Sequence, residues 1–387
     1  MYTFHLLTLP HAKVTKDYVH CAFTQKILNM TKMFGIMDKD WKLITYGTEW
    51  WETNYGDFVV SFSQEQFNKV YPTDHKTKLF DSTNPEWWKL YCDQTIEEIQ
   101  KRRTGKDILL ISYGYAHEPI KRALWMPTIE MGIGYPASMK DCYRIFESYA
   151  WMYTHYGNDR QIVSWHYDTV IPNYFDTKDF IFNDKPKEYY VFIGRASWDK
   201  WRQIAVDVCI ELGKELKLAG QGWDTINEYL VKKKQEGKDI SKIEHIWRVG
   251  QKEKNELVRN AIAQFVPTLY VEPFAWVQIE ALLCWTPIIT SDSWVFNETN
   301  HQWVTGWRCK HYQDYLEAVR RIGEIERKKC RRFGEKYSLE NIMKYYRAYF
   351  EKITTVVEHI AEKGDQKERY EDVKWLDYNV FDLYYNK

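Results

Sequence analysis

Short apolar runs alternate with longer amphipathic segments along nearly all of the 387 residues. Strands that alternate with helices form parallel sheets covered on both faces, so this pattern predicts α/β domains. In the first half we predict strands at 4–9, 42–46, 58–62, 107–112 and 125–131, and a helix at 21–34. In the second half we predict strands at 190–193, 216–219, 245–249, 263–269 and 287–291, and a long helix at 337–353.

The chain length predicts two domains, because single hydrophobic cores rarely grow beyond about 250–300 residues. A polar segment rich in Asp and Lys, with Pro172 and Pro186, separates the two sets of strands. We therefore predict an N-terminal domain over 1–170, a linker over 171–189 and a C-terminal domain over 190–336. A C-terminal helix and aromatic tail over 337–387 are predicted to pack back on the body.

Charge and cysteine usage exclude some classes of protein. Lys plus Arg and Asp plus Glu number 54 each, so strong non-specific attraction of the whole molecule to nucleic acid is not expected. The seven cysteines contain no C-x-x-C pair, which favours a reducing interior over a disulfide framework or a zinc site. The N-terminus is typical of a first strand, and no apolar run reaches membrane-spanning length. A cytoplasmic protein is predicted.

Aromatic residues make up 17% of the chain, with 18 Trp and 29 Tyr. Two interpretations stay open at this point: the rings fill cores, or some of them stack against sugars or bases.

Two glutamates eight residues apart are the most informative polar feature. Glu272 follows the predicted strand 263–269, and Glu280 lies in the helix after it. A helix turns about 100° per residue, so Glu280 can face the same side as the loop that carries Glu272. Carboxylates accept charge-assisted hydrogen bonds, and ligands bind at the carboxyl ends of parallel strands. The pair predicts a site for a polyhydroxylated ligand, although an exposed pair on a helix surface has the same spacing.

A glycine turn after the predicted strand 190–193 carries Gly194, Arg195 and Lys200. Backbone N–H groups at a helix start attract phosphate, and Arg and Lys add positive charge. The turn predicts an anion site, or else an ordinary β–α turn with two surface cations.

Together, the spacing of Glu272 and Glu280 and the G-R-x4-K element at 194–200 resemble the signatures of retaining family 4 glycosyltransferases with the GT-B fold. The resemblance implies two Rossmann-like domains with parallel sheets facing a central cleft. It further implies a nucleotide-diphosphate-sugar donor, most often a UDP-sugar, and no required metal.

Site roles follow from the resemblance. Gly194, Arg195 and Lys200 would hold the donor diphosphate, Glu272 the sugar hydroxyls in a catalytic position, and Glu280 the ribose. The glycine loop at 216–222 and the segment 246–250 are similar to the nucleotide-binding segments. They contribute the predicted nucleotide-binding residues Gly222, Arg248 and Val249.

In the N-terminal half, His117 follows the predicted strand 107–112 in a loop, where an imidazole can orient a hydroxyl near the sugar. We predict it as a catalytic residue. The predicted acceptor side comprises His11, Lys16, Gly134 and Tyr135. These segments also resemble a branch of glycosyltransferases known mainly from bacteriophage and environmental genomes.

Two residues depart from the family pattern: Trp285 and Ala275 stand where glycine is common. Because of these two residues, the identity of the donor sugar is not predicted. The leading hypothesis is sugar transfer with retention to an acceptor hydroxyl, with a hydroxymethylated pyrimidine in phage DNA as one acceptor. A glycan or lipid-linked acceptor, a catalytically inert GT-B binding module and a nucleotide-sugar epimerase are the alternatives.

Overall fold

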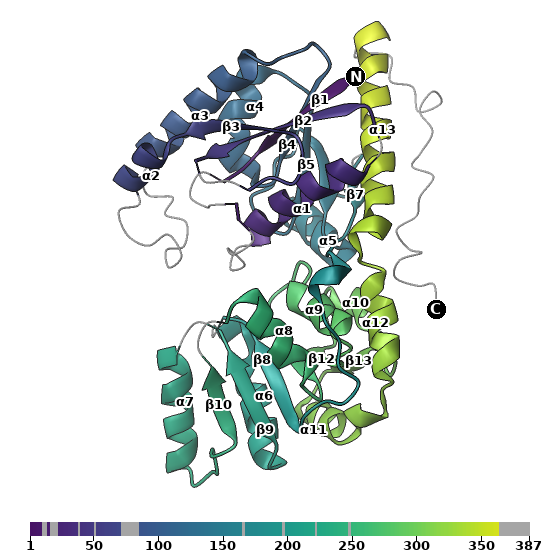
Figure 1. Ribbon diagram of the computed structural model, residues 1–387. Helices are drawn as coiled ribbons and strands as arrows, with labels where there is room; N and C mark the ends of the chain where they lie inside the picture. The colour runs from purple at the N-terminus through teal and green to yellow at the C-terminus, as the bar shows by residue number, and fades with distance from the viewer. Residues whose placement is uncertain are drawn as a thin grey trace. The chain divides into compact units, whose positions relative to one another are not determined.

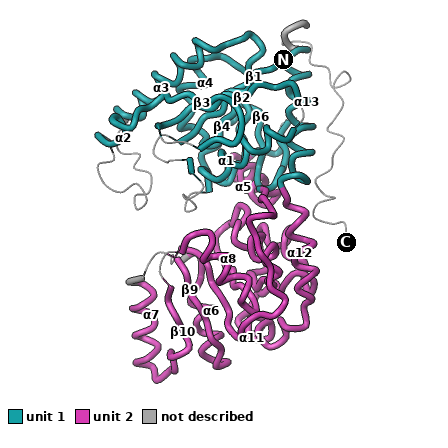
Figure 2. The backbone as a smooth tube through the Cα atoms, in the orientation of Figure 1, with its two compact units in different colours: residues 1–147, 161–173, 339–382 teal, residues 148–160, 174–338, 383–387 magenta. Residues whose placement is uncertain are grey.

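The computed structural model describes residues 1–9, 14–15, 22–37, 39–49, 52–70, 85–164, 167–195, 198–220, 223–246 and 249–363. These residues divide into two compact units (Figure 2). Unit 1 draws its described residues from 1–147, 161–173 and 339–363. Unit 2 draws them from 148–160 and 174–338.

Unit 1 is built on a seven-stranded sheet with the order β3-β2-β1-β4-β5-β6-β7, in which every described pairing is parallel (Figure 1). Its strands are β1 (Tyr2–Leu7), β2 (Trp41–Thr48), β3 (Asp57–Phe62), β4 (Asp107–Ile111), β5 (Thr128–Ile133), β6 (Tyr143–Phe146) and β7 (Thr169–Val170). Its helices are α1 (Ala22–Ile36), α2 (Gln64–Val70), α3 (Pro85–Gln100), the 3-10 helix η1 (Gly114–His117), α4 (Glu118–Leu124) and α13 (Leu339–Lys363).

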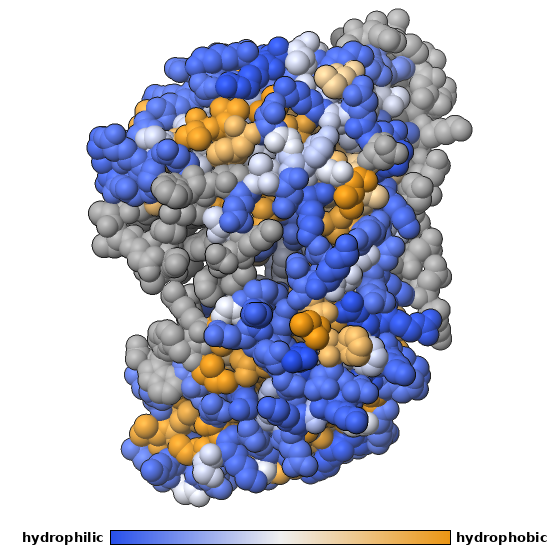
Figure 3. All heavy atoms as spheres, in the orientation of Figure 1, coloured by the Kyte–Doolittle hydropathy of each residue, from blue (hydrophilic) through white to orange (hydrophobic). Residues whose placement is uncertain are grey.

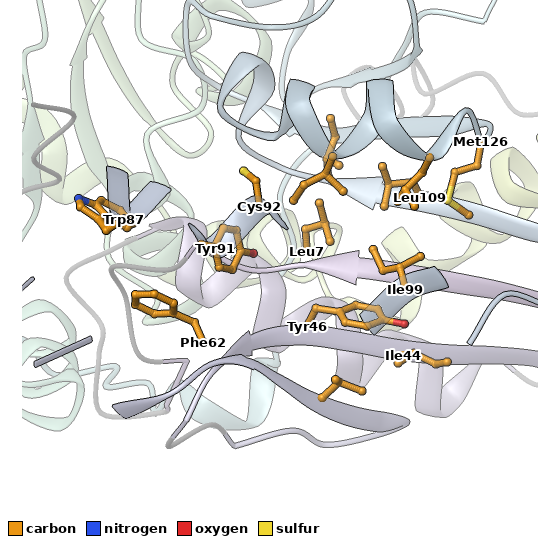
Figure 4. Packing of buried hydrophobic residues seen from close by; sticks show 14 of the residues in the cluster. Leu7, Ile44, Tyr46, Phe62, Trp87, Tyr91, Cys92, Ile99, Leu109 and Met126 are labelled. Atoms are coloured by element: carbon orange, nitrogen blue, oxygen red, sulfur yellow. The ribbon is translucent and has the colours of Figure 1, made fainter. Parts of the chain in front are cut away.

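Hydrophobic side chains cover both faces of this sheet, as a central parallel sheet requires. On one face, residues from the strands pack against α3 and α4; Figure 4 labels Leu7, Ile44, Tyr46, Phe62, Trp87, Tyr91, Cys92, Ile99, Leu109 and Met126. On the other face, Phe4 of β1 contacts Phe34 of α1 and Phe350 of α13, each with ring centroids 5.2 Å apart. The aromatic residues named here therefore fill the core.

Unit 2 has a six-stranded parallel sheet with the order β10-β9-β8-β11-β12-β13. Its strands are β8 (Tyr189–Ile193), β9 (Glu215–Ala219), β10 (Ile243–Ile246), β11 (Gln264–Val266), β12 (Ile288–Ser291) and β13 (Gly306–Cys309). Its α-helices are α5 (Tyr149–Asn158), α6 (Arg202–Glu211), α7 (Trp223–Gln235), α8 (Gln251–Arg259), α9 (Trp276–Leu283), α10 (Phe296–Thr299), α11 (Tyr312–Arg321) and α12 (Arg327–Glu335). The 3-10 helices are η2 (Thr177–Asp179), η3 (Trp198–Lys200) and η4 (Ile322–Glu324).

The two sheets share one topology. In each, the first strand lies inside the sheet, the next two are added on one side, and the following strands are added on the other side. The order therefore reverses between β1 and β4 in unit 1, and between β8 and β11 in unit 2. This is the Rossmann arrangement, in which the connections on either side of the reversal diverge and leave a crevice at the carboxyl ends of the strands. The prediction of two Rossmann-like α/β units is confirmed.

Each unit also receives a helix from a distant part of the sequence. Helix α5 belongs to unit 2, where the Glu298 carboxylate accepts hydrogen bonds from the backbone N–H groups of Tyr149 (3.1 Å) and Ala150 (2.6 Å). Helix α13 belongs to unit 1, where the Tyr349 hydroxyl donates to the carbonyl of Tyr167 (2.7 Å). The units are therefore not continuous segments of the chain.

Several predicted elements have different bounds in the structure. The strand expected over 125–131 begins at Thr128, because Trp125 ends α4 in a left-handed conformation (φ 48°). The strand expected over 263–269 is limited to Gln264–Val266, after which the chain turns toward α9. The strands β6, β7 and β13 were not predicted: Arg144 interrupts the apolar run of β6, Arg308 interrupts that of β13, and β7 is only two residues long.

The face of the molecule shown in Figure 3 is mostly hydrophilic, with apolar patches between the polar groups. None of the described helices combines the length and the apolar character needed to cross a membrane. Six cysteines in the described part of the chain are free.

Glu298 makes the stability of unit 2 depend on pH. Burial raises the pKa of its carboxyl from 4.5 to about 7, while the hydrogen bonds from Ala150 and Tyr149 act in the opposite direction. Because the unfolded chain loses this proton at lower pH than the folded protein, the stability contribution is complete below about pH 4.5 and is lost as pH rises through about 7. Between pH 5 and pH 7.5, this carboxyl should lower the free energy of unfolding by about 2–3 kcal/mol, and we expect Glu298→Gln to abolish that change.

The measurement is the difference between the melting temperatures at pH 5 and pH 7.5, for the wild type and for Glu298→Gln. Other titrating groups contribute equally to both proteins, so the difference should shrink in the variant. An unchanged difference would contradict the assigned cause.

Candidate functional site

A pocket opens at the strand-order reversal of unit 2, at the carboxyl ends of β8 and β11. Its volume is about 210 Å³. It is lined by Phe192, Ile193, Gly194, Arg195, Lys200, Phe265, Val266, Thr268, Glu272, Ala275, Trp276 and Val277. The strand ends, the turn after β8 and the start of α9 thus surround one cavity at the place where this topology positions ligands. Of the residues predicted from the sequence, Gly194, Arg195, Lys200 and Glu272 come together here.

Lys200, Tyr270 and Glu272 form a hydrogen-bonded group at this pocket. The Lys200 ammonium is ion-paired with Glu272 Oε2 and donates to the Tyr270 hydroxyl (3.0 Å). The Tyr270 hydroxyl in turn donates to Glu272 Oε1 (2.7 Å). Burial raises the pKa of Tyr270 well above its usual value, and the Glu272 charge raises it further, so the phenol stays protonated and remains a donor. Both carboxylate oxygens of Glu272 are therefore held in place.

The turn after β8 fits closely against the end of β9. The Gly194 N–H donates to the carbonyl of Ala219 (3.0 Å), and Gly220 follows with φ +144°. A Cβ at position 220 would lie 1.8 Å from the Gly194 carbonyl oxygen, so only glycine fits there. This close approach fixes the backbone that presents Arg195, whose side chain is exposed.

The first residues of α9 contribute backbone N–H groups to the same pocket. Ala275 caps the helix with φ 58°, and Trp276 and Val277 follow as its first helical residues. The first N–H groups of a helix have no partner within the helix and carry a partial positive charge. Together with Arg195 and Lys200, they make this pocket suited to an anionic group.

Glu280 is directed to a different partner. It lies on α9, is 8% exposed, and pairs with the Lys254 ammonium of α8 (2.6 Å). Val249 directly precedes Gly250, the N-cap of α8. Glu280 and Val249 do not line the pocket that contains Glu272, and the structure does not test their predicted roles. Sequence reasoning missed Lys254 and Tyr270, because neither belongs to a recognised motif.

Trp285 lies away from the pocket. It follows the C-terminus of α9, whereas the pocket is lined by residues at the N-terminus of the same helix. Its ring stacks on Phe182, with ring centroids 4.2 Å apart and planes inclined by 11°. Trp285 therefore does not line this pocket, since helix α9 lies between the two. Of the two departures from the family pattern, Ala275 is the one that lines the cavity.

In unit 1, the described site residues His117 and Tyr135 are buried, and Gly134 is partly buried. His117 is 0% exposed and ends the 3-10 helix η1 rather than standing in a loop, and its Nε2 lies 3.2 Å from the Thr8 carbonyl oxygen. Tyr135 is buried and donates to Glu130 (2.6 Å). A Cβ on Gly134 would lie 2.4 Å from the Glu147 carboxylate.

Gly134 therefore lies against an ion pair that the sequence did not reveal. The Lys26 ammonium pairs with Glu147 and donates to the Gly132 carbonyl (2.8 Å).

Four predicted site residues, His11, Lys16, Gly222 and Arg248, lie outside the described residues. Within the described part of the chain, no group of three or more His, Cys, Asp or Glu side chains is arranged to hold a metal ion.

Residues 175–338 match the family model of the group 1 glycosyl transferases. This segment covers most of unit 2 and contains the whole pocket. No curated protein matches the chain.

Solved structures match over nearly the whole length. AviGT4, a glycosyltransferase involved in avilamycin A biosynthesis, is 16% identical with a TM-score of 0.63, covering 92% of this chain and 98% of that one. Sucrose-phosphate synthase from Thermosynechococcus elongatus is 14% identical with a TM-score of 0.67, covering 92% and 100%. HepE of Anabaena in complex with UDP-glucose is 11% identical with a TM-score of 0.63, also covering 92% and 100%.

At these identities the solved structures establish the fold. The chain has the GT-B fold, and its residues 175–338 match the model of the group 1 glycosyl transferases.

Proposed function

We propose that the protein is a glycosyltransferase that moves a sugar from a nucleotide-diphosphate-sugar to an acceptor hydroxyl with retention of configuration. The observation that carries the proposal is the pocket at the β8–β11 reversal, which combines two cations, a helix start and a fixed carboxylate. The family model over residues 175–338 supports the class of reaction. The UDP-glucose in the HepE structure supports a UDP-sugar as donor.

The cations and helix amides suit the diphosphate of such a donor. Arg195, Lys200 and the first N–H groups of α9 would stabilise the negative charge that grows on the leaving nucleoside diphosphate. Lys200 is now paired with Glu272, so a bound diphosphate would share the ammonium. Glu272 would then accept hydrogen bonds from the sugar hydroxyls while Tyr270 keeps it in position. No metal is required in this arrangement.

Retention follows if the acceptor attacks from the face that the diphosphate leaves. The bond between the anomeric carbon and the phosphate oxygen breaks, and a bond from the acceptor oxygen forms on the same face. The acceptor proton passes to the departing phosphate oxygen, so atoms and charge balance without a protein base.

The remaining donor contacts extend beyond this pocket. Ligand sites usually measure about 300–1,000 Å³, so a cavity of about 210 Å³ suits one part of a nucleotide sugar. We assign the ribose to Glu280, which Lys254 orients, the base to the segment 246–250 with Arg248 and Val249, and a further nucleotide contact to Gly222 of the glycine loop.

The acceptor is assigned to unit 1, near His117, Gly134, Tyr135, His11 and Lys16. Burial of His117 and Tyr135 favours a positioning role for both over direct contact with the acceptor. A hydroxymethylated pyrimidine in phage DNA is one candidate acceptor, and a glycan or lipid-linked sugar is the other; a formal charge of zero favours neither. A catalytically inert binding module is the alternative, and the presence of Arg195, Lys200 and Glu272 in one pocket argues against it.

The direct test mixes the protein with UDP-, GDP- and dTDP-sugars and with DNA containing 5-hydroxymethylcytosine or 5-hydroxymethyluracil, followed by mass spectrometry of nucleosides and free nucleotides. A hexose-shifted nucleoside would establish donor and acceptor together. Nucleoside diphosphate release without modified DNA would support transfer to another acceptor. No turnover of any donor would favour the binding module, and an epimerised donor without release would favour the epimerase.

Lys200→Ala should lower donor turnover by about 10²–10³-fold, because it removes the buried charge that faces both Glu272 and the proposed diphosphate. Release of nucleoside diphosphate measures the effect. Lys232→Ala is the matched control, since Lys232 is exposed on α7. Equal activity of the two variants would contradict the assigned role.

Tyr270→Phe should lower kcat/KM by about 10-fold or more, because it removes a hydrogen bond to a charged carboxylate without changing the ring. A positioning role for Tyr270 predicts that Glu272→Ala and the double variant have equal activity. Tyr312→Phe, which loses an exposed hydrogen bond to Glu211, controls for loss of a phenol elsewhere in unit 2. Additive losses in the double variant would show that Tyr270 acts independently of Glu272.

A further inference from the structure

Seven non-glycine residues in the described part of the chain have positive φ angles, and five of them are tryptophans. They are Trp125 (48°), Trp201 (47°), Trp285 (63°), Trp294 (54°) and Trp303 (68°). The left-handed region favours glycine, and among other residues it favours Asn, Asp and His, whereas a bulky residue there is an outlier. No Asn, Asp or His is among the seven. Side-chain preference therefore does not explain which residues occupy these positions.

Trp285 occupies the position in a helix ending that most depends on glycine. The Trp285 N–H donates to the Leu282 carbonyl (3.0 Å), and the Thr286 N–H donates to the Ala281 carbonyl (2.9 Å). These two bonds define a Schellman motif, in which the left-handed residue after the C-cap is usually glycine.

Trp125 shows the same feature at the end of α4. It has left-handed angles (φ 48°, ψ 52°), and its N–H donates to the Lys121 carbonyl (3.1 Å). Its side chain is 90% exposed, so no packing compensates for the strained backbone. The position has the backbone of a helix-ending glycine with an indole projecting into solvent.

The other three are in turns. Trp303 donates its N–H to the Gly306 carbonyl (3.0 Å) in the turn before β13 and is 51% exposed. Trp294 is 40% exposed between β12 and α10. Trp201 directly follows Lys200 and caps α6 with left-handed angles.

Some other tryptophans are buried and have ordinary backbone angles, as is usual for a large aromatic residue. Trp87 in α3 is 4% exposed and Trp151 in α5 is 8% exposed, and neither has a positive φ. The chain contains as many Trp as Gly residues, 18 of each. Two groups of tryptophans explain these facts: one group is buried in the core, and the other stands at positions whose backbone suits glycine. The second group accounts for the high number of tryptophans and for their positive φ angles.

We propose that the protein made in its own cell carries glycine at positions 125, 201, 285, 294 and 303, because one codon at these positions is read there as glycine. UGA is a codon that suits this inference, since different translation systems read it as stop, tryptophan or glycine. Glycine at 201 would relax the backbone next to Lys200 in the candidate donor pocket. The inference does not depend on the proposed function.

The first test is the nucleotide sequence of the gene at its tryptophan positions. We expect UGA at the five left-handed positions and UGG at Trp87 and Trp151. UGG at the five positions, or one codon at all seven, would overturn the inference.

The second test compares Gly with Ala at two positions of the recombinant full-length chain. Both substitutions remove the indole, so their difference reports the backbone alone. At the left-handed position 125, Trp125→Gly should melt about 2 °C above Trp125→Ala. At the helical position 151, Trp151→Gly should melt below Trp151→Ala by a similar amount.

A reversal of sign between the two positions supports glycine at 125. Ala as stable as Gly at 125, with the expected order at 151, would overturn the inference for that site. If Trp151 variants fail to fold, Trp88 in α3 provides a second control, because Gly is also less stable than Ala within a helix.

Discussion

The reversal of strand order between β8 and β11 is the constraint on which the candidate site depends. Because β9 and β10 are added on one side of β8 and β12 and β13 on the other side of β11, the connections from β8 and β11 diverge. The backbone between their carboxyl ends stays uncovered, and the polar groups that follow both strands can meet there. Lys200, which follows β8, and Glu272, which follows β11, are 72 residues apart in sequence yet form an ion pair.

The ion pair between Lys200 and Glu272 also keeps the side chains of the pocket in place when no ligand is bound. Lys200 and Glu272 are both mostly buried, and an unpaired charge there would be strongly destabilising. Tyr270 donates to one carboxylate oxygen and Lys200 bonds to the other, so the carboxylate is fixed without any bound ligand. A preformed arrangement of this kind reduces the reorganisation needed when charge develops on a leaving group.

The sequence predicted the fold and part of the site for a physical reason. Strand–helix alternation identifies parallel sheets, and G-R-x4-K and the glutamate spacing are local patterns whose residues lie on a single turn or helix start. Partners from distant segments were not predictable: Lys254 reaches Glu280 from α8, and α5 joins unit 2 through Glu298. His117 was predicted in a loop because the 3-10 helix η1 is only four residues long and has no periodic signal.

The two departures from the family pattern lie at opposite ends of α9, so one concerns the pocket and the other concerns the helix ending. Ala275 at the N-terminal end lines the pocket and packs with Val266, Val295 and Phe296, so its methyl group occupies space that glycine would leave open to the ligand. Trp285 at the C-terminal end strains the helix ending and stacks on Phe182, away from the cavity. Position 275 is therefore the one that can change the shape of this pocket, whereas the left-handed backbone at 285 affects the stability of the helix ending, where glycine would remove the strain.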